Sequence, residues 1–97
     1  MRFSRAEHNA AEEIGKSISL YRRISGITAA ELAERAGFGR DTMSRIERGD
    51  PSVSFGARLS ASKVLGISHL VIKAFDPMST DYGRMQLERH VPKRVRS

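Results

Sequence analysis

The sequence contains no cysteine and no long apolar run. Without cysteine the chain can form neither a disulfide nor a thiolate metal site, which suits a reducing compartment. No apolar stretch approaches the ~20 residues that a membrane-spanning helix needs. The first nine residues, MRFSRAEHN, are too polar for a signal peptide. We therefore expect a cytoplasmic protein with no membrane partner.

Residue groups typical of catalysis are also missing. The three histidines, His8, His69 and His90, lie in separate segments, and no HExxH, CxxC or paired-carboxylate spacing accompanies them. Neither the G-x-x-x-x-G-K-[ST] nor the G-x-G-x-x-G pattern of phosphate-binding loops is present. The GFG string at 37–39 is the turn between two predicted helices. The sequence predicts no enzyme activity, no catalytic residue, no metal site and no cofactor.

Acidic residues are outnumbered by basic ones. The 97 residues carry a formal net charge of +6, and the last fourteen hold five Lys or Arg residues against one Glu. A basic protein gains binding free energy by releasing counterions from phosphates, so an anionic partner is favoured. The length indicates one small domain, and the 39% apolar content suffices for a helical core that association would help to stabilise.

The stretch from Thr28 to Gly49, TAAELAERAGFGRDTMSRIERG, has the pattern of two short helices joined by a tight turn. Thr28 and Glu31 have the spacing of a capping box, which predicts the start of the first helix. Gly37 follows the last apolar position, where helices commonly end in a left-handed conformation that glycine adopts readily. Phe38 is expected to fill the corner. The pattern predicts a helix-turn-helix motif.

The second helix of this motif, about residues 40–48, is the expected recognition helix. Met43 and Ile46 have the spacing of an inward face, so the polar side chains lie outward. Arginine, threonine and serine suit guanine edges, thymine methyls and phosphates in a major groove. The predicted contacts are base edges for Arg40 and Arg45, phosphate or base for Thr42 and Ser44, and either a cytosine amine or only the helix start for Asp41.

The segment before the motif predicts one longer helix that ends near residue 25. Two starts fit the cap-x-x-Glu pattern, Ser4 with Glu7 and Asn9 with Glu12, and we favour the earlier one. Apolar residues recur there at three- and four-residue steps, as expected for one helix face. They are Ile14, Ile18, Tyr21 and Ile24.

Two further helices are expected after the motif. Ser54 should cap a helix over residues 55–65 with Phe55, Leu59 and Val64 facing inward. Ser68 should cap another over residues 69–75, which is apolar over most of its circumference. A small domain cannot bury so much apolar surface on one side, so this helix is a natural two-fold contact. Each chain has one recognition helix and more apolar surface than it can bury. We therefore predict a homodimer on a palindromic operator.

The C-terminal region predicts a last helix and a basic tail. The helix should begin at residue 80 or 81, end at residue 90, and pack on the core or on a partner subunit. We expect the tail, residues 91–97, to be mobile because Pro92 blocks a helix. Its Lys93, Arg94 and Arg96 would serve as a DNA arm, as a partner-binding segment, or not at all, and we favour the DNA arm because the motif already implies phosphate as the anion. We therefore predict an all-α chain, with a five-helix DNA-binding domain over residues 1–76 and a C-terminal helix and tail over residues 77–97.

Residues from about 14 to 75 resemble the Xre/phage-repressor family of helix-turn-helix regulators. The strings AELAERAG, residues 30–37, and SRIERG, residues 44–49, carry the resemblance. It implies a sequence-specific transcriptional repressor that binds double-stranded DNA. It also implies a semi-buried salt bridge between Arg22 and Glu47.

The resemblance also implies phosphate contacts on both sides of the recognition helix. Ser52 and Ser54 lie where the fourth helix of such repressors starts against the DNA backbone, and free N–H groups at a helix start attract phosphate. For Ser54 a purely structural role as a cap is equally consistent. On the other side, Ala29 replaces the glutamine that often follows the cap threonine. The phosphate contact beside Thr28 is then either missing or left to the backbone N–H.

The second half of the chain looks like the HipB-like antitoxins that pair with HipA-family kinase toxins. The segment GDPSVSFG, residues 49–56, and the ending HVPKRVR, residues 90–96, carry this resemblance. It implies a protein that represses its own operon and binds a HipA-like kinase toxin. The alternative is a stand-alone or phage-type repressor with no toxin partner.

Overall fold

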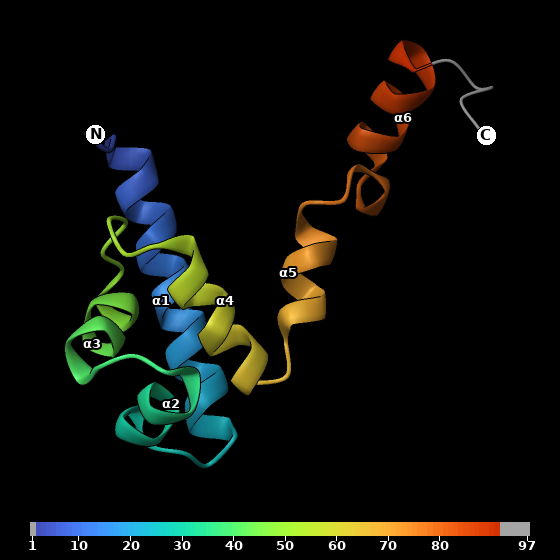
Figure 1. The fold of residues 1–97 in the computed structure, drawn as a ribbon. Coiled ribbons are helices and arrows are strands. Elements are labelled where there is room, and N and C mark those ends of the chain that lie inside the picture. The colour runs from blue at the N-terminus through green and yellow to red at the C-terminus, as the bar shows by residue number, and fades with distance from the viewer. Residues whose placement is uncertain (1, 92–97) are drawn as a thin grey trace.

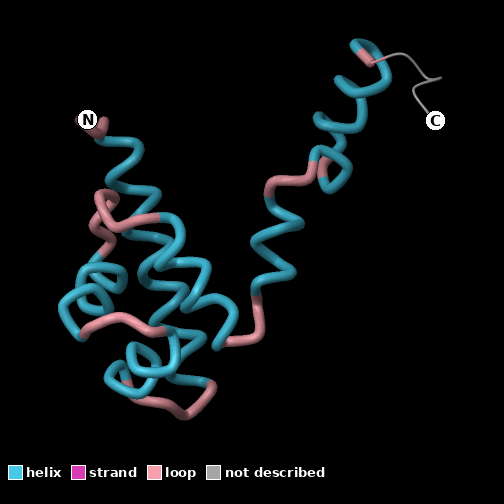
Figure 2. The backbone as a smooth tube through the Cα atoms, viewed as in Figure 1, coloured by secondary structure: helices cyan, strands magenta, loops and turns pink. Residues whose placement is uncertain are grey.

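Helices are the regular elements of residues 2–91, the part of the chain that this computed structural model describes (Figure 1). No strand is present among these residues (Figure 2), so the all-α prediction is confirmed. In chain order the elements are α1 (Arg5–Ile24), α2 (Ala29–Ala36), α3 (Arg40–Arg48), α4 (Phe55–Val64), α5 (Ser68–Ala74), the 3-10 helix η1 (Pro77–Ser79) and α6 (Asp81–His90). Residues 2–91 contain no helix suited to crossing a membrane.

Side-chain caps set the starts of α1 and α2. Ser4 Oγ accepts from the Glu7 amide at 3.2 Å, and the Glu7 carboxylate accepts from the Ser4 amide at 2.8 Å, so the earlier start is correct. Thr28 and Glu31 exchange the same two bonds at 3.0 and 2.7 Å. The bond from the Thr28 amide lowers the pKa of Glu31. Each box therefore holds the first turn of its helix in place.

The turn of the motif depends on glycine. Gly37 ends α2 with a φ of 87°, and Gly49 ends α3 with a φ of 83°, both in the left-handed region that favours glycine. Phe38 packs against the core between the two helices, as expected. The helix-turn-helix prediction is confirmed in both its helices and its turn.

The core lies where α1 to α4 meet. Leu32 of α2 and Met43 and Ile46 of α3 are its largest fully buried side chains. Ile18 of α1, Ala33 of α2, Val53 of the α3–α4 loop and Ala61 of α4 also belong to it. The inward face of α3 therefore agrees with the prediction, and its polar residues are left at the surface.

The backbones of α1 and α3 come unusually close. A Cβ atom on Gly15 would lie 2.6 Å from the carbonyl oxygen of Ile46, and a Cβ atom on Gly49 would meet the backbone of Glu12. Neither backbone can yield as a flexible side chain could. These glycines therefore bring α3 and its C-terminal end against α1.

Two local expectations were wrong. Phe55, expected inside, is 54% exposed. It is the first residue of α4, and its ring instead packs edge to face on Phe75 with the centroids 5.8 Å apart. Ser68 is the first residue of α5 rather than its cap, because Ile67 occupies the cap position. The Asp76 side chain begins the next turn by accepting from the Met78 amide.

The C-terminal arm, residues 68–90, comprises α5, η1 and α6. Figure 1 shows α5 turning back from the end of α4 and diverging from it, and α6 projecting away from the body formed by α1 to α4. The described residues extend 49 × 30 × 21 Å as a result. The expected packing of the last helix on the core of its own chain is not found, because α6 packs on η1.

Candidate nucleic-acid interface

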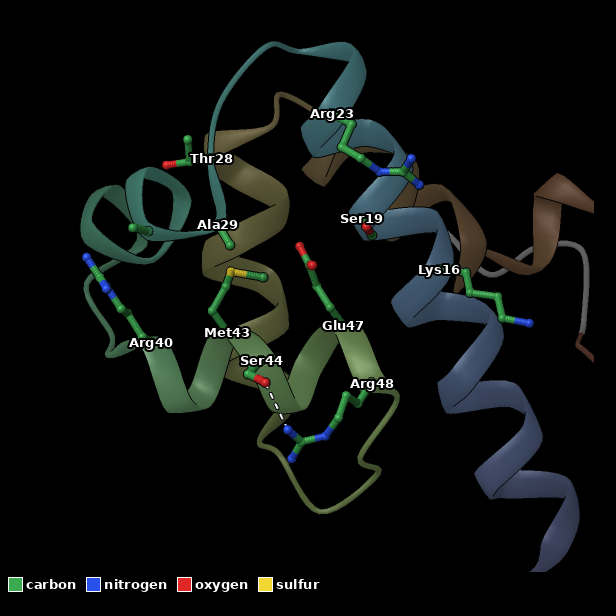
Figure 3. A pocket seen from close by; sticks show the side chains of 11 residues that line it. Lys16, Ser19, Arg23, Thr28, Ala29, Arg40, Met43, Ser44, Glu47 and Arg48 are labelled. Atoms are coloured by element: carbon green, nitrogen blue, oxygen red, sulfur yellow. Dashed lines mark hydrogen bonds between the residues drawn. The ribbon is translucent and has the colours of Figure 1, made fainter.

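The exposed face of α3 presents polar side chains in one stripe. Arg40, Ser44 and Arg48 recur every four residues, and all three are exposed. Arg48 Nη1 donates to Ser44 Oγ at 2.9 Å, so the two side chains form one polar surface (Figure 3). Buried Met43 and Ile46 anchor the opposite face of the helix. The core therefore fixes the direction in which this stripe points.

A basic groove of about 720 Å³ runs along this stripe, between α1, the start of α2 and α3 (Figure 3). Four cationic side chains line it, two from α1 and two from α3. Hydroxyl groups of Ser19, Thr28 and Ser44 lie between them. The cations are Lys16, Arg23, Arg40 and Arg48. Cations and hydroxyl groups together are what a phosphate backbone requires.

The carboxylate that lines the groove is already neutralised. Arg22 Nε donates to one Glu47 oxygen at 2.6 Å, and Arg22 Nη2 donates to the other at 3.2 Å. Arg22 Nη1 also donates to the Ile27 carbonyl at 3.1 Å. The two side chains are only 15% and 18% exposed, and the hydrogen bond to Glu47 raises the pKa of Arg22. The pair joins α1 to α3 and leaves the groove with net positive charge.

Arg45, on the other side of α3, organises the loop that leads to α4. Its Nε donates to Asp50 Oδ2 at 3.0 Å, and its Nη2 donates to Ser52 Oγ at 3.0 Å. Asp50 also accepts from the Ser52 hydroxyl and amide, at 2.7 and 2.9 Å. These Ser52 hydrogen bonds, followed by that from Arg45, hold the pKa of Asp50 well below its usual range. A base contact by Arg45 would therefore compete with its loop contacts.

Arg58 of α4 supports the same loop from beneath. It donates to the carbonyls of Val53 and Asp50, both at 2.7 Å. Partial burial lowers the pKa of Arg58. Ser54 caps α4 by accepting from the Ala57 amide at 3.1 Å, as predicted. The loop that carries Ser52 and Ser54 is therefore held by arginines at both ends.

The predicted DNA contacts fall into two groups around α3. Thr28, Arg40 and Ser44 line the basic groove. The rest lie on the outer face of α3, on its far side or in the α3–α4 loop. They are Asp41, Thr42, Arg45, Ser52 and Ser54. The tail residues Lys93, Arg94 and Arg96 lie outside the described part of the chain.

Sequence reasoning missed the part of the groove that α1 contributes. Lys16, Ser19 and Arg23 follow i, i+3 and i+7 spacing, which places them on one side of a helix. That spacing is a signal in the sequence, but it does not show which neighbour the stripe faces. Arg48 has the spacing of an outward-facing residue, but the predicted contacts did not include it.

The fold and the groove define a helix-turn-helix module with a cationic face. Residues 13–72 match the family model described as a helix-turn-helix domain, so the chain belongs to this family, of the Xre type expected from its strings. Over 72 residues the chain is 38% identical to the HTH-type transcriptional regulator SinR of Bacillus licheniformis, covering 70% of this chain and 63% of that protein.

A second relative gives a similar match. The chain is 41% identical over 58 residues to the HTH-type transcriptional regulator SinR of Bacillus subtilis (strain 168), covering 57% of this chain and 50% of that protein. The matched region thus spans between half and two thirds of each relative. No solved structure matches the chain.

Proposed function

We propose that this protein is a sequence-specific DNA-binding transcriptional repressor. The observation that carries the proposal is the basic groove beside the exposed polar face of α3. Its relatives are transcriptional regulators by name, which supports the same class. Insertion of α3 into a major groove would bring the two flanks of α3 against the two phosphate strands.

The two flanks have different chemistry. On one flank, Lys16, Ser19 and Arg23 of α1 would contact phosphates, together with the start of α2 at Thr28. On the other flank, Ser52 and the start of α4 at Ser54 would contact the opposite strand. These contacts position the helix but do not discriminate between bases.

Base discrimination would come from the face between these flanks. Arg40 is exposed and held by no side-chain hydrogen bond among the described residues, so its guanidinium is available for a guanine edge. Asp41, Thr42, Ser44 and Arg45 would add the remaining contacts. For Arg45 the contact would require it to share or leave its bonds to the α3–α4 loop.

The repressor would act as a homodimer on a palindromic operator. A single α3 would read only one half-site of such an operator. In addition, the C-terminal arm exposes the apolar side chains of Leu70, Ile72 and Phe75. A two-fold dimer would cover this surface and would place the two recognition helices about one helical turn of DNA apart.

A selection experiment tests the proposal. The purified chain is used to enrich duplexes from a random pool, and affinity is then measured for the enriched and a scrambled duplex at fixed salt. Arg40→Gln should cost about 1–3 kcal/mol on the enriched duplex and much less on the scrambled one. Arg35→Gln, an equal charge change on α2 outside the groove, is the control. Failure to enrich any sequence would refute the proposal.

The finer role, an antitoxin that binds a HipA-like kinase toxin, remains a prediction from the resemblance of residues 49–56 and 90–96. Purification of the native chain with its bound proteins tests it, since a kinase-sized partner is expected. Recovery without such a partner favours the stand-alone repressor.

The basic tail is tested separately. If it is a DNA arm, truncation after residue 90 should reduce the slope of log affinity against log salt by up to roughly three units, about 0.9 per lost phosphate contact. An unchanged slope would remove the tail from the DNA interface.

A further inference from the structure

An apolar groove of about 740 Å³ lies on the side of the molecule formed by α1, α4 and α5. Aliphatic and aromatic side chains line most of it. Ile14 of α1 is 49% exposed, and Leu70 of α5 is 42% exposed, although both belong to apolar faces. The Phe55 and Phe75 rings, which are in edge-to-face contact, also line it. The described part of the chain therefore leaves this apolar groove open to solvent.

No residue of α6 is buried in this structure. The helix has ten residues, all within the described part of the chain. Tyr82 is 70% exposed and Met85 is 47% exposed. Helices this short are marginal in water unless an apolar face packs on something. α6 therefore needs a surface that the body of its own chain does not supply in this structure.

Short contacts join α6 to η1, the turn that links it to α5. Gly83 lies so close to the backbone of Pro77 in η1 that a Cβ atom would not fit there. Arg84 Nη1 donates to the Met78 carbonyl at 2.8 Å, and the Asp76 side chain accepts from the Met78 amide at 2.9 Å. These contacts make η1 and α6 one unit, so α6 could reach the groove of its own chain only through a backbone change at the α5–η1 junction, where the Asp76 amide donates to the Lys73 carbonyl at 3.1 Å.

We infer that α6 of one copy occupies the apolar groove of a second copy, with the reciprocal contact completing a two-fold dimer. The two unpartnered apolar surfaces of the chain then cover each other, and a closed symmetric pair leaves neither exposed. The inference rests on the homodimer of the proposed function, but not on its DNA binding.

Charge complementarity supports this pairing. Tyr82, Met85 and Arg89 follow i, i+3 and i+7 spacing and therefore share one stripe of α6. Glu13 is the carboxylate that lines the apolar groove; its Oε2 lies 3.9 Å from Lys16 Nζ, and Arg58 is the cation among the lining residues. Tyr82 and Met85 would enter the groove, while Arg89 meets Glu13 at its edge.

Cross-linking tests the inference directly, because the chain has no cysteine of its own. One preparation carries Ile14→Cys in the groove, and the other carries Met85→Cys on α6 and a tag that changes its mass. After subunit exchange without DNA, a short bis-maleimide should join the two into a product of mixed mass. Met85→Cys mixed with Glu34→Cys, an exposed position on α2, is the matched control and should give little product.

Two cross-linking results would overturn the inference. If a chain carrying both Ile14→Cys and Met85→Cys is joined within itself and no mixed product forms, its own α6 fills the groove. If Ile72→Cys joins two copies while the mixed pair does not, the copies meet through α5 and leave α6 aside.

Sedimentation supplies an independent measurement. Tyr82→Ser should raise the dissociation constant of the dimer roughly tenfold or more, because it removes the largest apolar side chain of the α6 stripe. Glu34→Ser should leave the constant unchanged, and circular dichroism should show both variants folded. A wild-type chain that stays monomeric at micromolar concentration would overturn the inference, whatever its affinity for DNA.

Discussion

Glu47→Ala removes the acceptor of both side-chain hydrogen bonds that join α1 to α3. Arg22 would keep its charge and its bond to the Ile27 carbonyl, but it would lose its counterion at a site where its side chain is only 15% exposed. Breaking a fully buried pair costs about 3–5 kcal/mol, and breaking an exposed pair costs about 0–1 kcal/mol. For a pair that is mostly but not fully buried, we expect about 2–3 kcal/mol.

The assay is thermal and urea unfolding followed by circular dichroism. In a domain of this size each kcal/mol shifts the melting temperature by about 4–8 °C, so Glu47→Ala should lower it by roughly 10–20 °C. Glu34→Ala, which removes an exposed carboxylate on α2, is the matched control and should change stability by less than about 0.5 kcal/mol. DNA affinity measured well below the melting transition should fall less than stability does.

A paired substitution tests the cause of the loss. Arg22→Met with Glu47→Leu replaces both charged groups by apolar ones, so no charge is left without a partner. This double variant should recover part of the stability lost in Glu47→Ala. A melting temperature of Glu47→Ala no lower than that of Glu34→Ala would refute the reasoning, since the pair would then contribute nothing to the fold.

Three further predictions address packing, charge and pH. Gly15→Ala should destabilise the fold by about 1–3 kcal/mol in urea unfolding, because its Cβ would meet the α3 backbone. A Cβ on Gly56 would make only an ordinary contact with Ser54 Oγ at 3.9 Å, so Gly56→Ala should be neutral or stabilising. Lys16→Gln with Arg23→Gln should reduce the salt slope of DNA binding by about 1.8 units if each contacts one phosphate, and an unchanged slope would place the DNA elsewhere. The pKa of Asp50 is lowered in the folded state. The ionised Asp50 carboxylate therefore stabilises the fold above its usual pKa of about 3.9, and this stabilisation is lost as the pH falls toward the folded-state pKa. Below about pH 4 the melting temperature of the wild type should drop more than that of Asp50→Asn.

Local signals in the sequence determined where most helices begin and end. The capping boxes at Ser4 and Thr28 join residues three positions apart, so their chemistry is complete within one turn of chain. The positive φ at Gly37 likewise depends on the residue itself. Helical spacing also identified the buried face of α3 through Met43 and Ile46. The amino-acid sequence alone therefore suffices to predict the helix-turn-helix and its family.

Tertiary structure decided which surfaces those helices share. Lys16 and Arg23 form an ordinary polar stripe until α1 packs beside α3, and only then do they extend the groove that Arg40 lines. Helical spacing predicts that Arg45 reads bases, but the fold places Asp50 and Ser52 within its reach. Spacing along a helix says which residues share a face, but not what that face meets.

The packing of the C-terminal arm could not be predicted from the sequence either. Helical spacing correctly predicted α6, but it does not show that α6 packs on η1 and not on the core. Phe55 is apolar and therefore expected inside, but it lies at the first position of α4 and meets Phe75 at the surface. Caps and periodicity act over one or two turns of helix, whereas burial depends on the elements that pack together, and these come from distant parts of the chain.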